Sequence, residues 1–124
     1  MSGHAYSARV RDCFFHPRHA GCLSAAVSAQ GEDQGMRLCL CAKTSGERIE
    51  TLRFRAWGCP HFIAAAEAFC RQFEGMSAAS LLDFSAKDLI SILPVPVEKT
   101  GRILVLEDVV RTLGSLLRTA EADD

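Results

Sequence analysis

The residues of this 124-residue chain best suited to chemistry are six cysteines, all within its first 70 positions: Cys13, Cys22, Cys39, Cys41, Cys59 and Cys70. Cysteine thiolates bind soft metal ions and act as nucleophiles. The chain has no Cys-x-x-Cys pair, so the usual signature of a zinc knuckle or a thioredoxin-type site is absent. The N-terminal residues contain no apolar signal-peptide core, which favours reduced thiols over a disulfide framework.

Cys59 has the strongest case for a chemical role because of its local sequence. It lies in Trp57-Gly58-Cys59-Pro60, between a segment of alternating apolar residues and a segment with helical spacing. Proline suits the first turn of a helix, so we expect Cys59 at a strand-to-helix junction. Backbone N–H groups and the helix dipole stabilise a thiolate at such a junction. The alternative is a partly buried thiol without a chemical role, and the sequence favours neither.

Two further pairs have spacings that chemistry could use. His16 and His19 could both reach a metal ion, but a structural role in their loop is favoured, because a metal needs matching partners nearby. Cys39 and Cys41 could form a thiol pair for metal or redox work, but small strand residues of this kind are usually structural. The remaining cysteines are interpreted as structural or incidental: Cys13, Cys22 and Cys70.

Alternating apolar residues predict the strands that position these side chains. Residues 36–42 and 49–56 alternate on either side of a turn at 44–46, which predicts a hairpin with one buried face. Cys39 and Cys41 are out of phase with the apolar set and are therefore expected on the opposite face of the sheet. Residues 21–35 have no period and are interpreted as a loop or an irregular edge segment.

Apolar residues at helical spacing predict helices before and after this hairpin. They occur within residues 4–15, which end before Pro17, and from Pro60 to Phe73. Ser77 and Ser85 are candidate N-caps of short helices, the second of which ends at 93–94. The last helix has a one-sided apolar stripe from Leu106 to Leu117, followed by a frayed tail over about 118–124. We therefore expect one α+β domain over 1–124, with a small antiparallel sheet of about three strands covered on one face by helices.

Composition narrows the classes of function. Fifteen acidic and 14 basic residues give a net charge of −1, which argues against binding the phosphate backbone of nucleic acid. No segment approaches the roughly 20 apolar residues that a membrane helix needs. No Ser–His–Asp, phosphate-loop or zinc-protease motif is recognisable. We expect a soluble, cytoplasmic, single-domain protein.

Several segments, taken in order, carry a resemblance to one family. They are His16-Pro17-Arg18-His19-Ala20-Gly21, Met36-Arg37-Leu38, Phe54-Arg55-Ala56-Trp57-Gly58-Cys59, Gly75-Met76-Ser77, and Ile103-Leu104 with Glu107 and Asp108. Together they resemble the IscU and NifU N-terminal family of iron–sulfur cluster assembly scaffolds. The resemblance covers nearly the whole chain and implies the same α+β fold.

The family's metal ligands are only partly matched. Members hold a cluster or a zinc ion with three cysteines, helped by an Asp and in some members a His. Cys59 matches the second cysteine, Glu32 stands at the place of the first, and no cysteine follows Cys70 to match the third. The resemblance therefore implies a divergent member that lacks two of the three ligand cysteines.

The resemblance also suggests which residues could replace the missing ligands. Glu32 and Asp33 are either replacement ligands or solvated acids, and solvation is the commoner role. His61 could pair with Cys59, although a residue two positions on at a helix start can face elsewhere. The candidate metal ligands are therefore Cys59, Asp33, Glu32 and His61, an oxygen-rich set that suits a single Fe²⁺ or Zn²⁺ better than an iron–sulfur cluster.

A partner-binding segment is implied near the last helix. In some family members a Leu-Pro-Pro-Val-Lys segment is read by a dedicated Hsp70-type chaperone. Here the corresponding residues are Leu93, Pro94, Val95, Pro96 and Val97, in a segment one or two residues longer. We predict that these five residues bind a partner, although the changed spacing speaks against the same chaperone.

Three functions follow from the resemblance. The first is a divergent scaffold-like protein that binds one iron or zinc ion weakly or works with the cysteine desulfurase machinery. The second is a metal-free interaction or regulatory module that has lost cluster assembly. The third is a sulfur-transfer protein that carries a persulfide on Cys59. The chain is expected to be a monomer or a homo-oligomer, and an oligomer could place two Cys59 thiols together.

Overall fold

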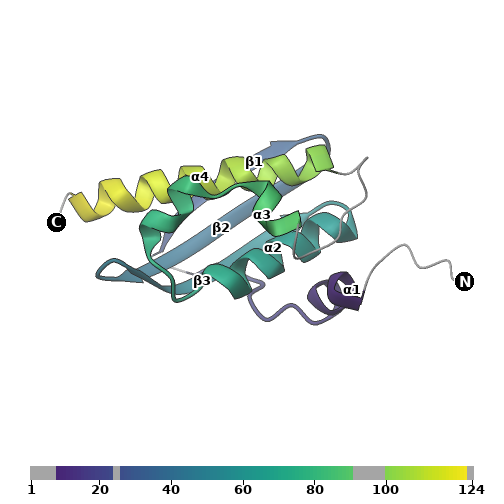
Figure 1. Ribbon diagram of the computed structural model, residues 1–124, viewed down its shortest axis with the longest axis horizontal. Helices are drawn as coiled ribbons and strands as arrows, with labels where there is room; N and C mark the ends of the chain where they lie inside the picture. The colour runs from purple at the N-terminus through teal and green to yellow at the C-terminus, as the bar shows by residue number, and fades with distance from the viewer. Residues whose placement is uncertain (1–7, 24–25, 91–99, 123–124) are drawn as a thin grey trace, which may run out of the picture.

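The computed structural model describes residues 8–23, 26–90 and 100–122. Its centre is a three-stranded antiparallel sheet in the order β1-β2-β3, formed by β1 (Val27–Asp33), β2 (Met36–Ser45) and β3 (Arg48–Trp57). Helices cover one face of this sheet (Figure 1). The predicted α+β class and the hairpin of β2 and β3 are confirmed.

The pairing register separates a core face of the sheet from an outer face. The core face of β2 carries Met36, Leu38, Leu40 and Ala42, all of which are buried. Cys39 and Cys41 lie on the outer face, as predicted from the alternation. They pair across the ladder with Arg55 and Arg53 of β3 respectively.

Strand β1 corrects the interpretation of 21–35 as a loop or irregular edge segment. Residues 27–33 pair with β2 along their whole length. Their pattern is weak because the core-facing positions hold small residues such as Ala29 and Gly31. A Cβ atom at Gly31 would lie 2.8 Å from Cγ2 of Val109, so the small residue allows the last helix to approach the strand closely. Gln34 and Gly35 have positive φ angles, which suit the two-residue turn into β2.

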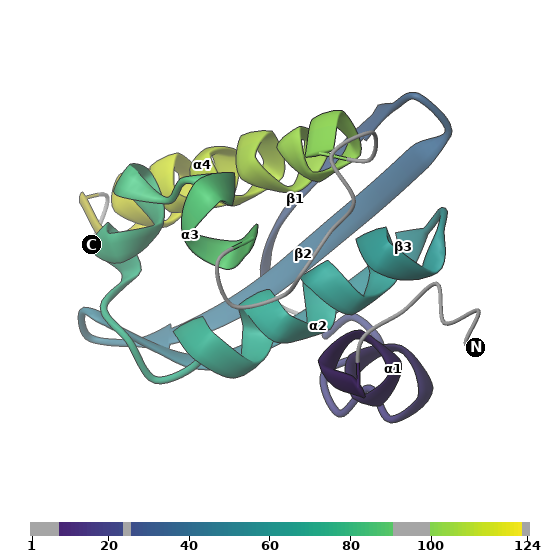
Figure 2. The same ribbon diagram turned by 45° about the vertical axis from the view of Figure 1, so that its right-hand side comes forward.

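The described residues also form five helical segments: α1 (Ala8–Phe15), α2 (Pro60–Phe73), the 3-10 helix η1 (Ala78–Asp83), α3 (Ala86–Ile90) and α4 (Thr100–Ala122). Helix α2 packs on β3, and α4 packs on β1 and β2, while α1 lies against α2 (Figure 2). Large, fully buried side chains of the core include Leu38, Leu40, Phe62, Phe69, Leu106 and Leu113.

The helix predictions agree with the described residues. The helix expected within 4–15 is present from Ala8, and its earlier residues lie outside the described part of the chain. The end expected at 93–94 for the second short helix also lies outside it. Helix α4 continues to Ala122, and the expected fraying of 118–124 stays a prediction. Within the described residues, no helix is long and apolar enough to cross a membrane.

A buried carboxylate joins the segment after α1 to helix α2. Glu67 has no solvent-exposed area, and its Oε1 accepts the backbone N–H of His19 at 2.8 Å. Its Oε2 lies 2.7 Å from Nδ1 of His19 and 2.8 Å from Nε of Arg71. Arg71 also donates to Oδ2 of Asp12 at 2.7 Å and to the carbonyl of His16 at 3.0 Å. The favoured structural role of His19 is therefore confirmed.

His19 also connects this segment to the outer edge of the sheet. Its carbonyl accepts the N–H of Phe54 at 2.9 Å, and the N–H of Gly21 donates to the carbonyl of Phe54 at 2.7 Å. These two bonds form a short parallel pairing between Ala20 and β3. The exposed edge of β3 is thereby paired over these residues, which protects it from other strands.

We predict that Glu67→Gln lowers the free energy of unfolding by about 2 kcal/mol, because hydrogen bonds to a charged, buried acceptor are lost. Urea unfolding of the two proteins measures this difference. The matched control is Glu32→Gln, which breaks the exposed pair of Glu32 with Arg37 at 2.9 Å and should cost less than about 1 kcal/mol. Equal effects of the two substitutions would contradict the role given to Glu67.

A second carboxylate predicts how stability depends on pH. Burial raises the pKa of Glu74, but bonds from the Leu52 N–H, His19 and Arg53 outweigh it and hold that pKa below its usual 4.5. A group with a lowered pKa stabilises the folded protein above its unfolded pKa and loses this contribution as the pH falls through its folded pKa. The unfolding free energy should therefore fall as the pH drops below about 4.5, and Glu74→Gln should make this fall less steep. Identical profiles for both proteins would contradict the assignment.

Candidate functional site

Cys59 lies at the strand-to-helix junction that the sequence predicts. It is the N-cap residue of α2, and Pro60 occupies the first turn. Its carbonyl accepts the N–H groups of Phe62 at 3.0 Å and Ile63 at 3.1 Å, while its side chain makes no capping hydrogen bond. The half-buried thiol packs at the margin of the core. The thiol is therefore held at the start of a helix without serving to cap it.

A close backbone contact fixes the end of the sheet at which Cys59 lies. Gly58 has a φ of 151°, and a Cβ atom there would collide with Sδ of Met36. Met36 pairs with Asp33 across the β1–β2 turn, and Arg37 pairs with Trp57. The β1–β2 turn and the start of α2 consequently lie at the same end of the sheet.

The predicted metal ligands at this end have different surroundings. Glu32 is exposed and forms an ion pair with Arg37 at 2.9 Å, and Asp33 is also exposed. His61 is only 1% exposed. Among the described residues, no set of three possible ligand atoms within 4.8 Å of one another includes Cys59 or these three side chains. Metal binding by Cys59, Asp33, Glu32 and His61 stays a prediction, and the predicted partner segment, Leu93 to Val97, lies outside the described residues.

A shallow groove runs beside the junction. Its volume is about 290 Å³, and it lies between the 17–21 segment and the end of β3, with Phe54, Trp57 and Ile63 among its lining residues. Trp57 is 50% exposed, and its ring lies 5.6 Å from the guanidinium carbon of Arg37. Trp57 therefore presents a half-exposed aromatic ring at this end of the sheet.

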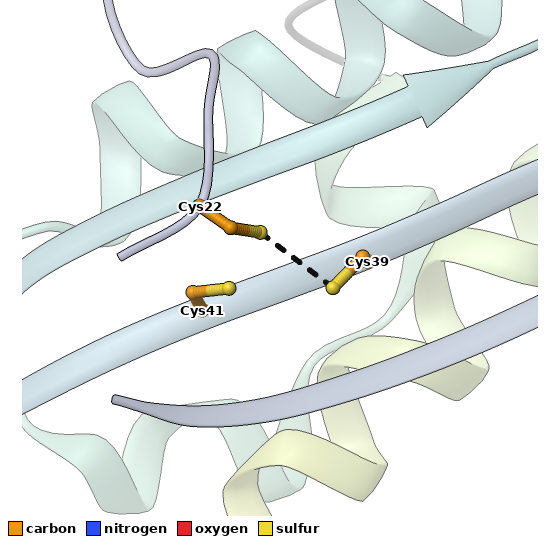
Figure 3. A group of neighbouring side chains, drawn as sticks. All are labelled: Cys22, Cys39 and Cys41. Atoms are coloured by element: carbon orange, nitrogen blue, oxygen red, sulfur yellow. Dashed lines mark hydrogen bonds between the residues drawn. The ribbon is translucent and has the colours of Figure 1, made fainter. Parts of the chain in front are cut away.

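A second group of thiols lies on the outer face of the sheet. Cys22, Cys39 and Cys41 point toward one another (Figure 3), and their Sγ atoms all lie within 4.8 Å of one another. The Sγ atoms of Cys22 and Cys39 are 3.6 Å apart. Cys41 is only 3% exposed, Cys39 is half-buried and Cys22 is exposed. We call these three residues the outer-face thiol cluster.

The surroundings of Cys22 and Cys39 raise the pKa of both thiols. Burial raises the pKa of Cys22, and hydrogen bonds with Cys41 and Cys39 raise it further. Burial also raises the pKa of Cys39, although the nearby charge of Arg55 acts in the opposite direction. A metal ion bound by these thiols would have to displace the protons of Cys22 and Cys39.

Cys22 is the member of this cluster that sequence reasoning missed. The sequence favours a structural or incidental role for it. Cys22 lies 17 residues before Cys39 in a segment without periodicity, so no local pattern links the two. The pairing of Ala20 and Gly21 with β3 places the next residue over the outer face of the sheet. The other two cysteines of that group, Cys13 and Cys70, are buried in the core, and burial raises the pKa of each.

The fold and the position of Cys59 define a small α+β domain with a thiol at the start of its first helix after the sheet. The family model described as NifU-like N terminal domain matches residues 5–113. The chain therefore belongs to the NifU-like N-terminal domain family, which confirms the resemblance found in the sequence. No curated protein matches the chain.

Solved structures support the same fold. A putative iron–sulfur cluster assembly scaffold protein for the SUF system from Fervidobacterium islandicum superimposes with a TM-score of 0.69 at 16% identity, covering 86% of this chain and 94% of that chain. A nitrogen-fixing NifU-like protein (N-terminal) from Brucella abortus superimposes with a TM-score of 0.58 at 16% identity, covering 93% and 84%. A hypothetical protein has a TM-score of 0.58 at 21% identity and covers 93% of both chains.

Proposed function

We propose that this chain works in iron–sulfur cluster assembly as a divergent scaffold-like protein that does not build clusters alone. The observation that carries the proposal is the family match over 5–113 together with a cysteine kept at the start of α2. In this proposal the protein acts in the cytoplasm and meets a cysteine desulfurase or another assembly protein. It contributes a binding surface and a thiol, not a catalytic reaction of its own.

The donor set at Cys59 does not fit an iron–sulfur cluster held by one chain. A [2Fe–2S] cluster is held by four thiolates, or by two thiolates and two imidazoles. Only one of the family's three cysteine positions is a cysteine here, and the neighbouring candidates Glu32 and Asp33 are carboxylates. A homo-oligomer could bring two Cys59 thiols together, whereas a monomer would be limited to a single ion.

A single Fe²⁺ or Zn²⁺ is compatible with the residues at this end of the sheet. Carboxylates and one thiolate, from Glu32, Asp33 and Cys59, are acceptable ligands for either ion, with His61 as a further candidate. Glu32 would first have to leave Arg37, and breaking an exposed ion pair of this kind costs less than about 1 kcal/mol. Such a site would be weak, which agrees with a role in transient contact with assembly partners.

The free side chain at the N-cap favours a second candidate, a persulfide carrier. Because the Cys59 thiol makes no capping bond, it is available to react. Its thiolate would attack the terminal sulfur of a persulfide on a cysteine desulfurase. One S–S bond forms on Cys59 while the donor S–S bond breaks, and the donor cysteine leaves as a thiolate. The exchange needs no external oxidant or reductant.

The loss of the first and third family cysteines favours the remaining candidate, a metal-free interaction module. Such a module would keep the exposed Trp57 and the groove beside it as a contact surface. The predicted partner-binding residues are a separate part of this candidate: Leu93, Pro94, Val95, Pro96 and Val97.

We predict that anaerobic reconstitution with Fe²⁺, cysteine and a cysteine desulfurase yields iron without an equal amount of acid-labile sulfide. Cys59→Ser should lose this iron, because it removes the one thiolate of the set. Cys22→Ser is the matched control. It removes an exposed cysteine from the outer-face thiol cluster, away from Cys59, and should retain the iron. Iron and sulfide in equal amounts on a monomer would contradict the proposal that the chain cannot build clusters alone.

Mass spectrometry of the same samples separates the two other candidates. A mass increase of one sulfur atom on Cys59 would identify the persulfide carrier. Neither iron nor added sulfur on Cys59, with a stable complex between the two proteins, would identify the interaction module. Loss of all three signals would overturn the proposed function.

A further inference from the structure

We propose that the outer-face thiol cluster is a binding site for one thiophilic d¹⁰ metal ion, Zn²⁺ or Cu⁺, held by the three thiolates of Cys22, Cys39 and Cys41. The site is separate from the one proposed around Cys59, because it lies on the outer face of the sheet and includes none of those residues. This metal-site proposal can therefore be tested independently of the proposed function.

The spacing of the sulfur atoms fits a single ion. Zinc–sulfur bonds are about 2.3 Å long, so sulfurs around one tetrahedral ion lie about 3.8 Å apart and no two can exceed about 4.6 Å. The sulfurs here are 3.6 Å apart in one pair and within 4.8 Å in all pairs. Movements of a few tenths of an ångström would bring all three sulfur atoms to bonding distance of one central ion. A preorganised site holds its ligands within about 0.5 Å of the binding geometry, so the movements needed are small.

Two of the three ligands are held rigidly. Cys39 and Cys41 lie in the central strand β2, which is paired on both sides: Cys39 lies between Gln30 and Arg55 in the register. Cys22 follows directly after Gly21, which is hydrogen-bonded to β3. A site that is largely formed before the ion arrives loses little conformational freedom when it binds.

The burial of the three thiols leaves one side open. Cys41 lies at the bottom of the cluster and Cys22 at its exposed side, so an ion can enter from solvent past Cys22. A water molecule could complete a tetrahedral zinc site there, whereas Cu⁺ is satisfied by three thiolates. Arg55, opposite Cys39, supplies a positive charge that offsets the net negative charge of three thiolates and one ion.

Apolar packing does not explain the cluster. The other outer-face positions next to the cluster in the register are polar or charged: Ser28, Gln30, Arg53 and Arg55. Cys22 is exposed. Three thiols gathered on such a face, from two segments of the chain, are better accounted for by their shared affinity for a soft ion.

The test is a competition titration of the reduced, full-length chain, with Zn²⁺ against a chromophoric chelator and with Cu⁺ against a Cu⁺-specific chelator. We expect one ion per chain in at least one of the two titrations. Cys22→Ser should weaken the binding of this ion at least about 100-fold. Loss of a residue that only hydrogen-bonds to a metal ligand costs at most about 100-fold, and Cys22 is proposed to be a ligand itself. Cys59→Ser is the matched control and should leave this affinity unchanged. The ion whose binding depends on Cys22 identifies the metal that the site takes.

Three results would overturn the proposal. The first is that neither ion binds, and the second is that Cys22→Ser binds as tightly as the unaltered chain. The third is that only Cys59→Ser loses binding, which would assign the ion to the other site. Because Cys22 is exposed, its substitution should leave the fold intact, and circular dichroism verifies this. Co²⁺ gives a second readout, since the thiolate-to-cobalt charge-transfer band should fall by about a third when one of three thiolates is removed.

Discussion

The hydrogen bonds of the buried Glu67 carboxylate to His19 determine the position of the segment that both thiol sites use. Its bonds to the backbone and ring of His19 hold the segment after α1 against α2. His19 and Gly21 then pair with Phe54 at the edge of β3. This pairing forms one wall of the groove beside Cys59 and also places Cys22 over the outer face. Removing one charged partner from a buried network of this kind strongly destabilises the folded protein, so substitutions of Glu67 or Arg71 should be poorly tolerated.

One end of the sheet and its outer face therefore carry two different groups of thiols. At the end of the sheet, only one of the family's three cysteine positions is a cysteine, Cys59. The exposed Trp57 lies at the same end. On its outer face, three thiols have come together that match none of the family ligands. In the proposed function, the first site makes transient contact with proteins that supply iron or sulfur. The second site is proposed to hold a single soft ion more firmly, because two of its three ligands lie in a strand paired on both sides and all three are thiols.

The sequence predicted those features that depend on local pattern. Strict alternation identified β2 and β3 and placed Cys39 and Cys41 on the outer face. Pro60 identified the junction at Cys59. Strand β1 was missed because its core-facing residues are small, and its pairing with β2 and contact with α4 stabilise it instead. The approach of Cys22 to Cys39 was missed because it depends on a pairing made 33 residues further along the chain, between Gly21 and Phe54.

The central claim is that the chain has two separate thiol sites: Cys59, which binds a metal ion weakly at most, and the outer-face thiol cluster, which binds one soft ion more tightly. The most direct measurement is alkylation of the folded chain with and without one equivalent of Zn²⁺ or Cu⁺, with each cysteine quantified by mass spectrometry. We expect the metal to protect Cys22, Cys39 and Cys41 together, while Cys59 reacts equally in both samples. Protection of Cys59 with continued reaction of Cys22 would contradict the account.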